Sequence, residues 1–379
     1  MADETRPIPF SKASYDEHEV EAVRAALAVQ ACGDGPAGRR VEARLAGMLG
    51  VHRVLLTTSG THALELALLA LGIGPGDEVV CPSFTFVSSA NAVLRVGARP
   101  VFADIEDRTL GLDAQDVERR LTPRTAAILP VDYAGVAPDM DALGAIAARR
   151  RLRVVEDAAQ GLAASWRGRA LGSLGDAGCL SFHETKNASC GEGGALAIQD
   201  PELAARAEIA REKGTNRSAF LRGQVDKYTW VSEGSSYVLS DVLAAILEAQ
   251  LDKLDAIQAA RARVVARYRD GLAGWVRSHG IRLPEPLPER VPNHHIFYLL
   301  YPDGPSRDEA LRRLRARGVM ATFHYVPLHS SPYGRTLAAE QPALPVTDRI
   351  AATLLRLPLH AELTDADVER VIEAVQETA

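Results

Sequence analysis

Hydrophobic residues recur in two alternating patterns along the first half of the chain. Between about residues 52 and 200, short runs typical of β-strands are separated by stretches with helical apolar spacing. This alternation is typical of a parallel sheet whose strands are joined by crossover helices. The predicted strands are Arg53–Thr57, Glu78–Cys81, Arg99–Ala103, Ala126–Val131, Arg153–Glu156, Gly178–Phe182 and Ala195–Ile198.

Two of the intervening helices have clear ends. The segments Thr61–Gly72 and Phe86–Gly97 keep apolar residues at helical spacing, and each ends on a glycine, which commonly follows a helix. We expect both helices to pack on the sheet.

The alternation stops at Ser240, where a single long amphipathic helix is predicted to leave the first domain. The sequence therefore predicts an α/β protein with a large domain, residues 1–245, and a connecting helix with a small α+β domain, residues 246–379. The small domain is expected to contain a strand at Ile296–Tyr301, a helix opened by the capping-box pattern Ser306-x-x-Glu309, a strand around Met320–Val326 and a final helix after Thr364.

Composition narrows the class of protein. The 379 residues are 47% hydrophobic and 24% charged, with a net charge of −6, so no general basic field favours nucleic acid as a partner. The four cysteines are scattered without a C-x-x-C pair, which argues against a disulfide framework or a zinc ribbon. A signal peptide would be apolar where this chain has Asp3, Glu4 and two prolines. No apolar stretch of the sequence is long enough to form a membrane-spanning helix. We expect a cytoplasmic protein without a membrane partner.

The first candidate for chemistry is the segment from Thr58 to His62, TSGTH, between a predicted strand and a predicted helix. Small residues there let the backbone N–H groups of the first helical turn approach a phosphate, and the helix dipole favours the anion. A plain helix cap by Ser59 or Thr61 explains the segment equally simply.

The second candidate is the acidic pair Glu156-Asp157 at the end of an apolar run. Ligands of open α/β sheets gather at the carboxyl ends of the strands, and a pyridoxal phosphate (PLP) enzyme needs an acid on the pyridinium nitrogen. Only one of the two side chains is expected to face inward, because side chains alternate across a strand. The competing interpretation is a helix cap beside a solvated acid.

The third candidate is Lys186, in the segment SFHETKN that follows a predicted strand and precedes the glycine cluster GEGG. A lysine in an apolar pocket beside a cationic cofactor loses proton affinity, so it can bind an aldehyde and then carry a proton. Most lysines are instead solvated on the surface, so its neighbours decide the interpretation.

Other motifs in the sequence give weaker evidence of function. The segment Gly33–Gly38 satisfies G-x-G-x-x-G, but it follows a helical pattern and contains a proline, so it is no dinucleotide fingerprint. The pair His294-His295 and the histidines His324 and His329 lack further ligands in sequence, so no metal site is expected.

Taken in order, TSGTHAL, PSFTF, VEDAAQG, SFHETKN and GEGGAL resemble the DegT/DnrJ/EryC1/StrS family of sugar aminotransferases over nearly the whole chain. The resemblance implies the fold of aspartate aminotransferase, a fold type I PLP enzyme whose large domain has a mixed, mainly parallel sheet. The segments SFHETKN, KYTW, GSSY and FHYVPLHSSP further resemble the branch that acts on dTDP-4-keto-6-deoxyglucose.

The resemblance also implies a role for each matching residue. Lys186 would bind the cofactor as a Schiff base, and Asp157 would pair with its pyridinium nitrogen. The remaining cofactor contacts would come from Gln160 at the ring hydroxyl, Phe86 stacked on the ring, and Gly60, Thr61 and Ser181 at the phosphate. His324 and Tyr325 are the candidates for lining the sugar pocket, with a structural role as the alternative.

One segment departs from the family. Where many relatives read N-Y-R-M, this chain has Ser236-Tyr237-Val238-Leu239. In those relatives the asparagine reaches the phosphate of the neighbouring subunit, which implies a homodimer with shared active sites, and Ser236 retains a hydrogen-bonding group. The arginine of those relatives has been linked to the donor's carboxylate. Val238 cannot bind a carboxylate, so another cation is required if the amino donor is L-glutamate.

The expected reaction is transfer of an amino group from L-glutamate to C4 of dTDP-4-keto-6-deoxyglucose. The alternatives are an aminotransferase for another nucleotide-linked keto sugar, a PLP-dependent or pyridoxamine-phosphate-dependent sugar dehydratase, and a non-catalytic relative that binds a sugar nucleotide. Dehydratases of this family carry histidine in place of the lysine, whereas Lys186 is present here.

Overall fold

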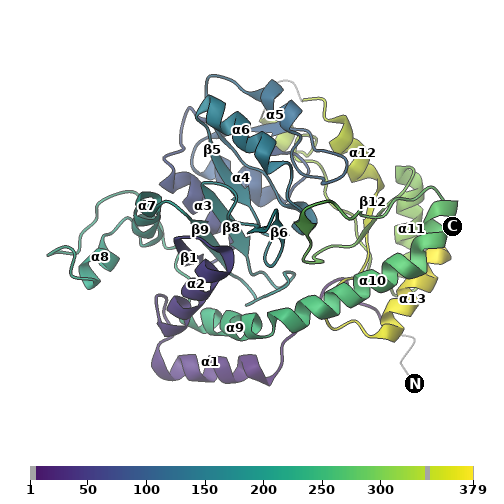
Figure 1. Ribbon diagram of the computed structural model, residues 1–379, viewed down its shortest axis with the longest axis horizontal. Helices are drawn as coiled ribbons and strands as arrows, with labels where there is room; N and C mark the ends of the chain where they lie inside the picture. Colours follow the sequence, from purple (N-terminus) through teal and green to yellow (C-terminus); the bar gives the residue numbers. More distant parts are fainter. Residues whose placement is uncertain (1–5, 338–341, 379) are drawn as a thin grey trace.

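A computed structural model describes residues 6–337 and 342–378 of the chain. Its centre is a seven-stranded sheet with the strand order β1-β9-β8-β5-β4-β2-β3, and Figure 1 shows this sheet in the middle of the molecule. All neighbouring pairs are parallel except those of β9, which is antiparallel to β1 and β8. The strands are β1 (Arg53–Thr57), β2 (Glu78–Pro82), β3 (Arg99–Ala103), β4 (Thr125–Ile128), β5 (Arg153–Asp157), β8 (Ala177–Ser181) and β9 (Gly194–Ile198).

The predicted α/β class and the mixed, mainly parallel sheet are therefore confirmed. Each of the seven predicted strands is present within a few residues of its expected bounds. The largest difference is at the end of β4, which leaves the ladder after Ile128, although Val131 still forms a single parallel bridge with Asp157.

Helices cover both faces of the sheet, which explains why its strands are continuous apolar runs. In β1, Leu55 packs into the core on one face, while Val54 and Leu56 pack on the other, as the alternation of side chains along a strand requires. The first face is covered by α3 (Gly60–Ala70), α4 (Val87–Arg95) and α7 (Pro201–Arg211), and the second by α2 (Pro36–Leu49), α5 (Ala114–Arg120), α6 (Met140–Arg150) and α9 (Asp241–Asp252). The predicted helices after Thr61 and Phe86 correspond to α3 and α4.

The predicted single helix after Ser240 is wrong in one respect, because the chain forms two helices. Helix α9 ends at Asp252 and α10 (Leu254–Ser278) follows at once, with Lys253 between them at φ −93° and ψ 0°. The Lys253 ammonium pairs with Asp16 and Glu19 at the start of α1 (Glu17–Val29). These tertiary contacts stabilise the interruption between α9 and α10, which the spacing of apolar residues alone does not predict.

Helix α10 rises from the end of α9 toward the right in Figure 1 and reaches the small C-terminal part. The core of that part is formed by α10, α11 (Gly304–Ala316), α13 (Asp365–Gln376) and the antiparallel strands β11 (Tyr298–Leu300) and β12 (Leu354–Arg356). Ile8, close to the start of the chain, packs into the same core. The division at residues 245 and 246 stays a prediction.

Two details of the small part correct the sequence analysis. Helix α11 begins earlier than expected, because Asp303 and not Ser306 is the cap: its carboxylate accepts a hydrogen bond from the Ser306 N–H at 2.8 Å. The segment Met320–Val326 forms no regular strand. It pairs at single positions, through a bridge from Thr322 to Arg356 and a hydrogen bond from the Met320 N–H to the Ile8 carbonyl. Its side chains line a cavity, and the partner of β11 is β12.

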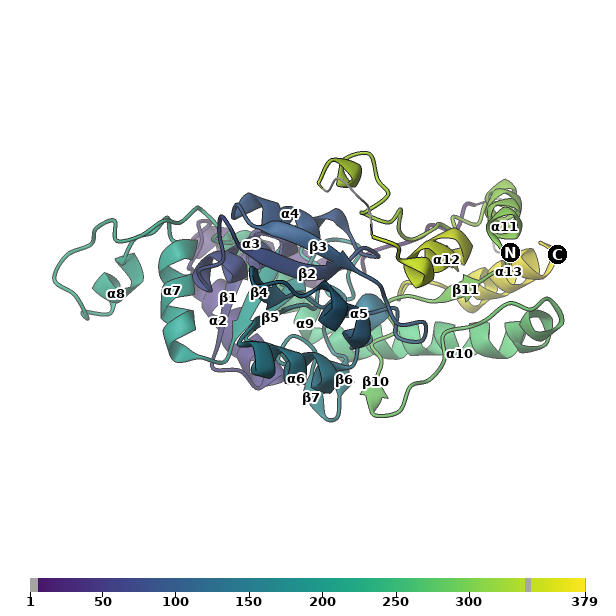
Figure 2. The ribbon, with the colours of Figure 1, turned by 90° about the horizontal axis from the view of Figure 1, so that it is seen from above.

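The last helix, α13, begins after Thr364 as predicted, and the Thr364 hydroxyl caps it. Seen from above, the molecule is elongated, with α8 (Arg217–Leu221) on an arm at one end and the small part at the other (Figure 2). No helix among the described residues is both long and apolar enough to cross a membrane. The remaining short elements are η1 (Tyr133–Gly135), β6 (Ser165–Trp166), β7 (Arg169–Ala170), β10 (Arg290–Val291), η2 (Gly334–Thr336) and α12 (Pro345–Thr353).

Candidate active site

A cavity of about 740 Å³ lies where the carboxyl ends of the parallel strands face the small part. Its size is in the usual range for a small-molecule site. Nine of the ten residues predicted for the site line it, and only Ser236 does not. The nine are Gly60, Thr61, Phe86, Asp157, Gln160, Ser181, Lys186, His324 and Tyr325.

The start of α3 forms one wall of the cavity. The Ser59 hydroxyl caps the helix by accepting the His62 N–H at 3.1 Å, so the simple capping interpretation is correct for Ser59. The N–H groups of Gly60 and Thr61, in the first turn, donate to no acceptor within the described chain. Ser181 lies so near that a side chain on Gly60 would come within 2.9 Å of its Cβ. Two free amides and a hydroxyl therefore converge where an anion could bind.

The acidic pair at the end of β5 is buried on both sides of the strand. The Asp157 carboxylate lines the cavity and accepts hydrogen bonds from the Ser89 hydroxyl at 2.7 Å and the Ala159 N–H at 3.2 Å. Glu156 instead accepts the backbone N–H groups of Gly172 and Leu174. The alternative of a helix cap beside a solvated acid is thus wrong, and the expected alternation of the two side chains is confirmed.

Asp157 carries a charge into a buried site. Burial raises the pKa of its carboxyl group above the ordinary value, while the hydrogen bond from Ser89, the Ala159 N–H and the charge of Lys186 lower it. The two hydrogen bonds leave one side of the carboxylate open to the cavity. This is the arrangement of an acid that gains stability from a cationic partner.

Lys186 follows β8 and extends into the same cavity. Burial lowers the pKa of its ammonium group to about 8; the Asp157 carboxylate opposes that shift, and the Arg356 guanidinium adds to it. Its neighbour Asn187 is fixed by hydrogen bonds to the Asn293 carbonyl at 2.7 Å and to His295 at 2.9 Å. Lys186 is therefore an amine that is partly neutral near physiological pH, on an anchored loop.

The opposite wall is aromatic and polar. The Gln160 amide oxygen accepts the Ala134 N–H at 2.6 Å, and its amide nitrogen donates to the Tyr325 hydroxyl at 3.3 Å. His324 and Tyr325 stack on each other with their ring centroids 3.6 Å apart. Phe86 stands at the start of α4 with 59% of its surface exposed, so its ring face is available to a ligand.

Sequence reasoning missed two cavity residues that bear on the chemistry. His295 donates its Nδ1 hydrogen to the Asn187 side chain, and burial keeps its pKa far below the ordinary value, so its Nε2 is an acceptor. Arg356 extends into the cavity from the end of β12. A charge inside the apolar run Leu354–Leu357 is the signal that could have identified Arg356.

Ser236 lies outside the cavity of its own chain. It is exposed at the base of the arm that carries α8, where it forms a single bridge with Glu212. Val238 pairs with Thr57 at the end of β1 and fills the space beside Gly33. Neither residue can reach a ligand in the cavity of its own chain.

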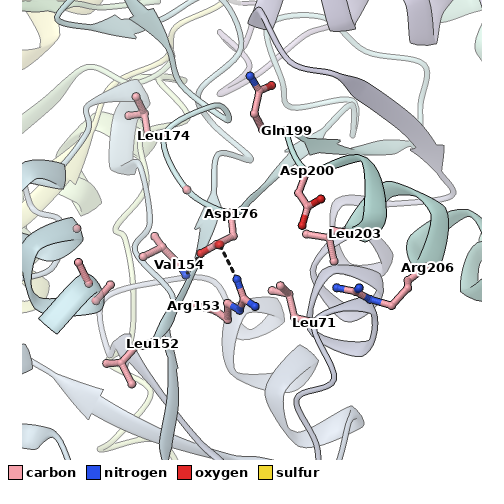
Figure 3. A pocket seen from close by; sticks show the side chains of 14 residues that line it. Leu71, Leu152, Arg153, Val154, Leu174, Asp176, Gln199, Asp200, Leu203 and Arg206 are labelled. Carbon is pink, nitrogen blue, oxygen red and sulfur yellow. Dashed lines mark hydrogen bonds and ion pairs between the residues drawn. The ribbon is translucent and has the colours of Figure 1, made fainter. Parts of the chain in front are cut away.

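A second hollow, of about 470 Å³, lies at the amino end of β5 (Figure 3). Its cations already have partners, since Arg153 pairs with Asp176 at 3.1 Å and Arg206 donates to the Ala70 carbonyl at 3.0 Å. No residue predicted for the site lines it. The chemistry is therefore concentrated in the larger cavity.

The residues of the larger cavity fit pyridoxal phosphate as a set. Free helix amides and Ser181 suit the phosphate, the open side of Asp157 suits a protonated ring nitrogen, and Lys186 suits the aldehyde. No adjustment of the backbone is needed to bring these groups to one cavity.

Comparison with known proteins agrees with this geometry. The sequence profile of the DegT/DnrJ/EryC1/StrS aminotransferase family matches residues 13–376. The aminotransferase TlmJ from Streptoalloteichus hindustanus and DesV from S. venezuelae are each 36% identical, with a TM-score of 0.89 and coverage of 98% of both chains. The PMP form of Spr1654 from Streptococcus pneumoniae is 27% identical, with a TM-score of 0.91 and coverage of 98% of this chain and 97% of that one.

The order of motifs along the sequence, the sheet and the cavity at its carboxyl edge all agree with this match. The chain belongs to the DegT/DnrJ/EryC1/StrS aminotransferase family, and it is a sugar aminotransferase that uses pyridoxal phosphate.

Proposed function

We propose that the protein transfers an amino group from L-glutamate to C4 of dTDP-4-keto-6-deoxyglucose, giving a dTDP-4-amino-4,6-dideoxyhexose. The observation that carries the proposal is the shared cavity of Lys186, Asp157 and the first turn of α3. The choice of sugar rests on the resemblance of SFHETKN and FHYVPLHSSP to one branch of the family. Both segments supply walls of this cavity, among them His183, Thr185, Phe323 and His324.

Each residue has a defined task in this reaction. When bound, pyridoxal phosphate supplies an aldehyde and a ring that accepts electrons from the reacting carbon. Gly60, Thr61 and Ser181 would hold the phosphate, and Asp157 would keep the ring nitrogen protonated by its negative charge. Phe86 would cover one face of the ring, and Gln160 would contact the ring hydroxyl.

Lys186 has a second task as a base and an acid. Because its pKa is about 8, the amine can accept the proton from the donor's α-carbon and can later return a proton to the sugar carbon. The aromatic residues His324 and Tyr325 line the part of the cavity where the sugar ring would lie. Burial keeps the pKa of His324 far below its ordinary value, so the imidazole meets the sugar as a neutral hydrogen-bonding group.

The homodimer belongs to the same proposal. The arm around α8 extends away from the body in both views (Figures 1 and 2), and a cluster of exposed apolar side chains on a monomer marks an interface. A second copy of the chain is the proposed partner, because Ser236 at the base of the arm cannot serve its own cavity. The exposed apolar residues of the arm are Phe220, Leu221, Val225, Tyr228, Trp230 and Val231.

The most direct test of the reaction is incubation of the holoenzyme with L-glutamate and dTDP-4-keto-6-deoxyglucose, followed by NMR of the sugar product. We expect an amine at C4 and one equivalent of 2-oxoglutarate. A 4-keto sugar recovered unchanged, while a 3-keto or UDP-linked sugar is aminated, would move the proposal to the alternative substrate. Loss of a hydroxyl in place of gain of an amine would identify a dehydratase.

A further inference from the structure

Arg356 is a cation in an apolar setting. It ends β12, where Leu354 and Leu355 are fully buried, and its side chain forms part of the cavity wall. Its backbone pairs with Tyr298 in β11 and with Thr322. The backbone of Arg356 is thus held on two sides, by β11 and by the extended segment around Thr322.

The contacts of Arg356 do not neutralise its positive charge. One terminal nitrogen donates to His324, 2.7 Å from Nε2, and the guanidinium lies 4.5 Å from the centre of the Phe10 ring. Its buried Nε has no hydrogen-bond partner among the residues that the structure describes. Burial lowers the pKa of Arg356, and the compensating groups are the phenols of Tyr133 and Tyr325. Within the described residues, no carboxylate forms an ion pair with it.

Such an arrangement is costly unless a ligand completes it. A buried cation without a counter-ion loses its hydration and regains little. Most other partly buried arginines of this chain are paired; Arg211, for example, pairs with Asp34 and Glu42. His324 cannot supply the missing charge, because its imidazole is neutral and offers Arg356 only the lone pair of Nε2. The fork of a guanidinium matches the two oxygens of a carboxylate.

We propose that Arg356 binds the α-carboxylate of the amino-acid donor, replacing the cation that Val238 cannot provide. The proposal rests on the proposed function, in which an amino acid reacts at Lys186. Arg356 and Lys186 line the same cavity, and the positive charge of Arg356 helps to lower the pKa of the Lys186 amine. The α-carboxylate is attached to the carbon whose nitrogen takes the place of the Lys186 amine, and it must therefore lie beside that amine.

The diphosphate of the sugar nucleotide is the competing occupant. It is attached at C1, across the sugar ring from the reacting C4, and would lie farther from Lys186 than a donor's α-carboxylate does. A second cation of the cavity, Arg315 on α11, is exposed to solvent. Arg315 thus offers a matched control for loss of one positive charge.

The test measures donor binding without turnover. α-Methyl-L-glutamate has no α-hydrogen, so it can displace Lys186 from the cofactor but cannot react further, and the absorbance change gives its Kd. We expect Arg356→Gln to weaken this binding roughly 10- to 100-fold, the range for a lost charge-assisted hydrogen bond. Arg356→Lys keeps the positive charge but lacks the forked guanidinium. Its Kd for α-methyl-L-glutamate should therefore lie between those of the wild type and Arg356→Gln. Arg315→Gln should leave the Kd unchanged.

A second ligand separates the carboxylate from the rest of the donor. Butylamine lacks any carboxylate, so its binding should be equal in the wild type and in Arg356→Gln. Equal binding of α-methyl-L-glutamate by the wild type, Arg356→Gln and Arg356→Lys would overturn the assignment and leave the proposed function intact. The same holds if calorimetry shows that the variants lose affinity for the sugar nucleotide but not for the donor. A wild-type holoenzyme that shows no response to any amino acid would instead contradict the proposed function itself.

Discussion

The Lys186 amine owes its low proton affinity to its surroundings. Burial is the largest cause of its lowered pKa, and the nearby charge of Arg356 adds to the shift that Asp157 opposes. Because a base with a lowered pKa is neutral above that value, the reactive form is lost as the pH falls through about 8. At pH 7 about a tenth of the amine is neutral, against less than about a thousandth for an ordinary lysine.

This shift predicts how the apoprotein captures its cofactor. The rate of covalent attachment of pyridoxal phosphate, followed by absorbance, should rise with pH and reach half its maximum near pH 8. Arg356→Gln removes a positive charge near the amine, so its midpoint should move to higher pH. A wild-type midpoint near that of a free lysine would show that the amine is solvated and would contradict the cavity as described.

Asp157 gives a second prediction at this scale. Asp157→Asn keeps the hydrogen bond with Ser89 possible but removes the charge that faces the ring nitrogen. Both half-reactions, measured separately by rapid mixing, should slow on the order of 100-fold or more. Glu156→Gln is the matched control, because its side chain binds the amides of Gly172 and Leu174 on the other side of β5. An unchanged rate in Asp157→Asn would show that the acid is misassigned.

Sequence reasoning could place Lys186 and Asp157 in one site, because Asp157 ends an apolar strand and Lys186 follows another whose end meets it in the parallel sheet. It could not identify Ser89, since a serine inside α4 has no distinctive spacing and becomes relevant only through its 2.7 Å contact with Asp157. Arg356 was missed for a similar reason. Its neighbours in the cavity, Phe10 and His324, are distant in sequence.

At the scale of elements, the strands were predictable because burial on both faces makes each a compact apolar run. Breaks held by tertiary contacts were not predictable. The stop at Lys253 depends on Asp16 and Glu19, which are more than two hundred residues away along the chain. The extended segment Met320–Val326 has the composition of a strand, but it borders a cavity and pairs at single positions.

The close approach of β9 to the start of α3 leads to a prediction at the same scale. A side chain on Gly194 would lie 2.4 Å from the backbone carbonyl of Ser59. Gly194→Ala should therefore displace the first turn of α3, weaken binding of pyridoxal phosphate and lower the free energy of unfolding by about 1–3 kcal/mol. Equilibrium denaturation and cofactor titration measure the two effects.

Gly47→Ala is the control for this substitution. Gly47 lies inside α2 with no atom within 4 Å of an added Cβ, so alanine should stabilise the helix by up to about 1 kcal/mol. If the two variants had the same stability and the same cofactor affinity, the close approach of β9 to Ser59 would not matter for cofactor binding or for folding.

The whole molecule is elongated, and its two ends differ in chemistry. The small part closes one side of the cavity, whereas the arm at the far end exposes apolar side chains, among them Trp230 with 78% of its surface exposed. Helix α8 has no buried residue, so the apolar surface of the arm is best explained by the proposed second copy.

Trp230→Asp tests that interpretation. Light scattering at several protein concentrations should show a dimer for the wild type and a monomer, or a dimer that dissociates on dilution, for the variant. Val29→Asp alters a similarly exposed apolar residue on α1 and should leave the mass unchanged. A monomeric wild type, or a Trp230→Asp variant as tightly dimeric as the wild type, would contradict the role of the arm.

The central claim is that Lys186 holds pyridoxal phosphate in the cavity between the sheet and the small part. Reduction of the holoenzyme with sodium borohydride, followed by proteolysis and mass spectrometry, tests this claim directly. We predict that the reduced cofactor is found on the peptide containing Lys186, and that Lys186→Ala, although folded, carries none. Labelling of another lysine, or full labelling and turnover in Lys186→Ala, would contradict the account.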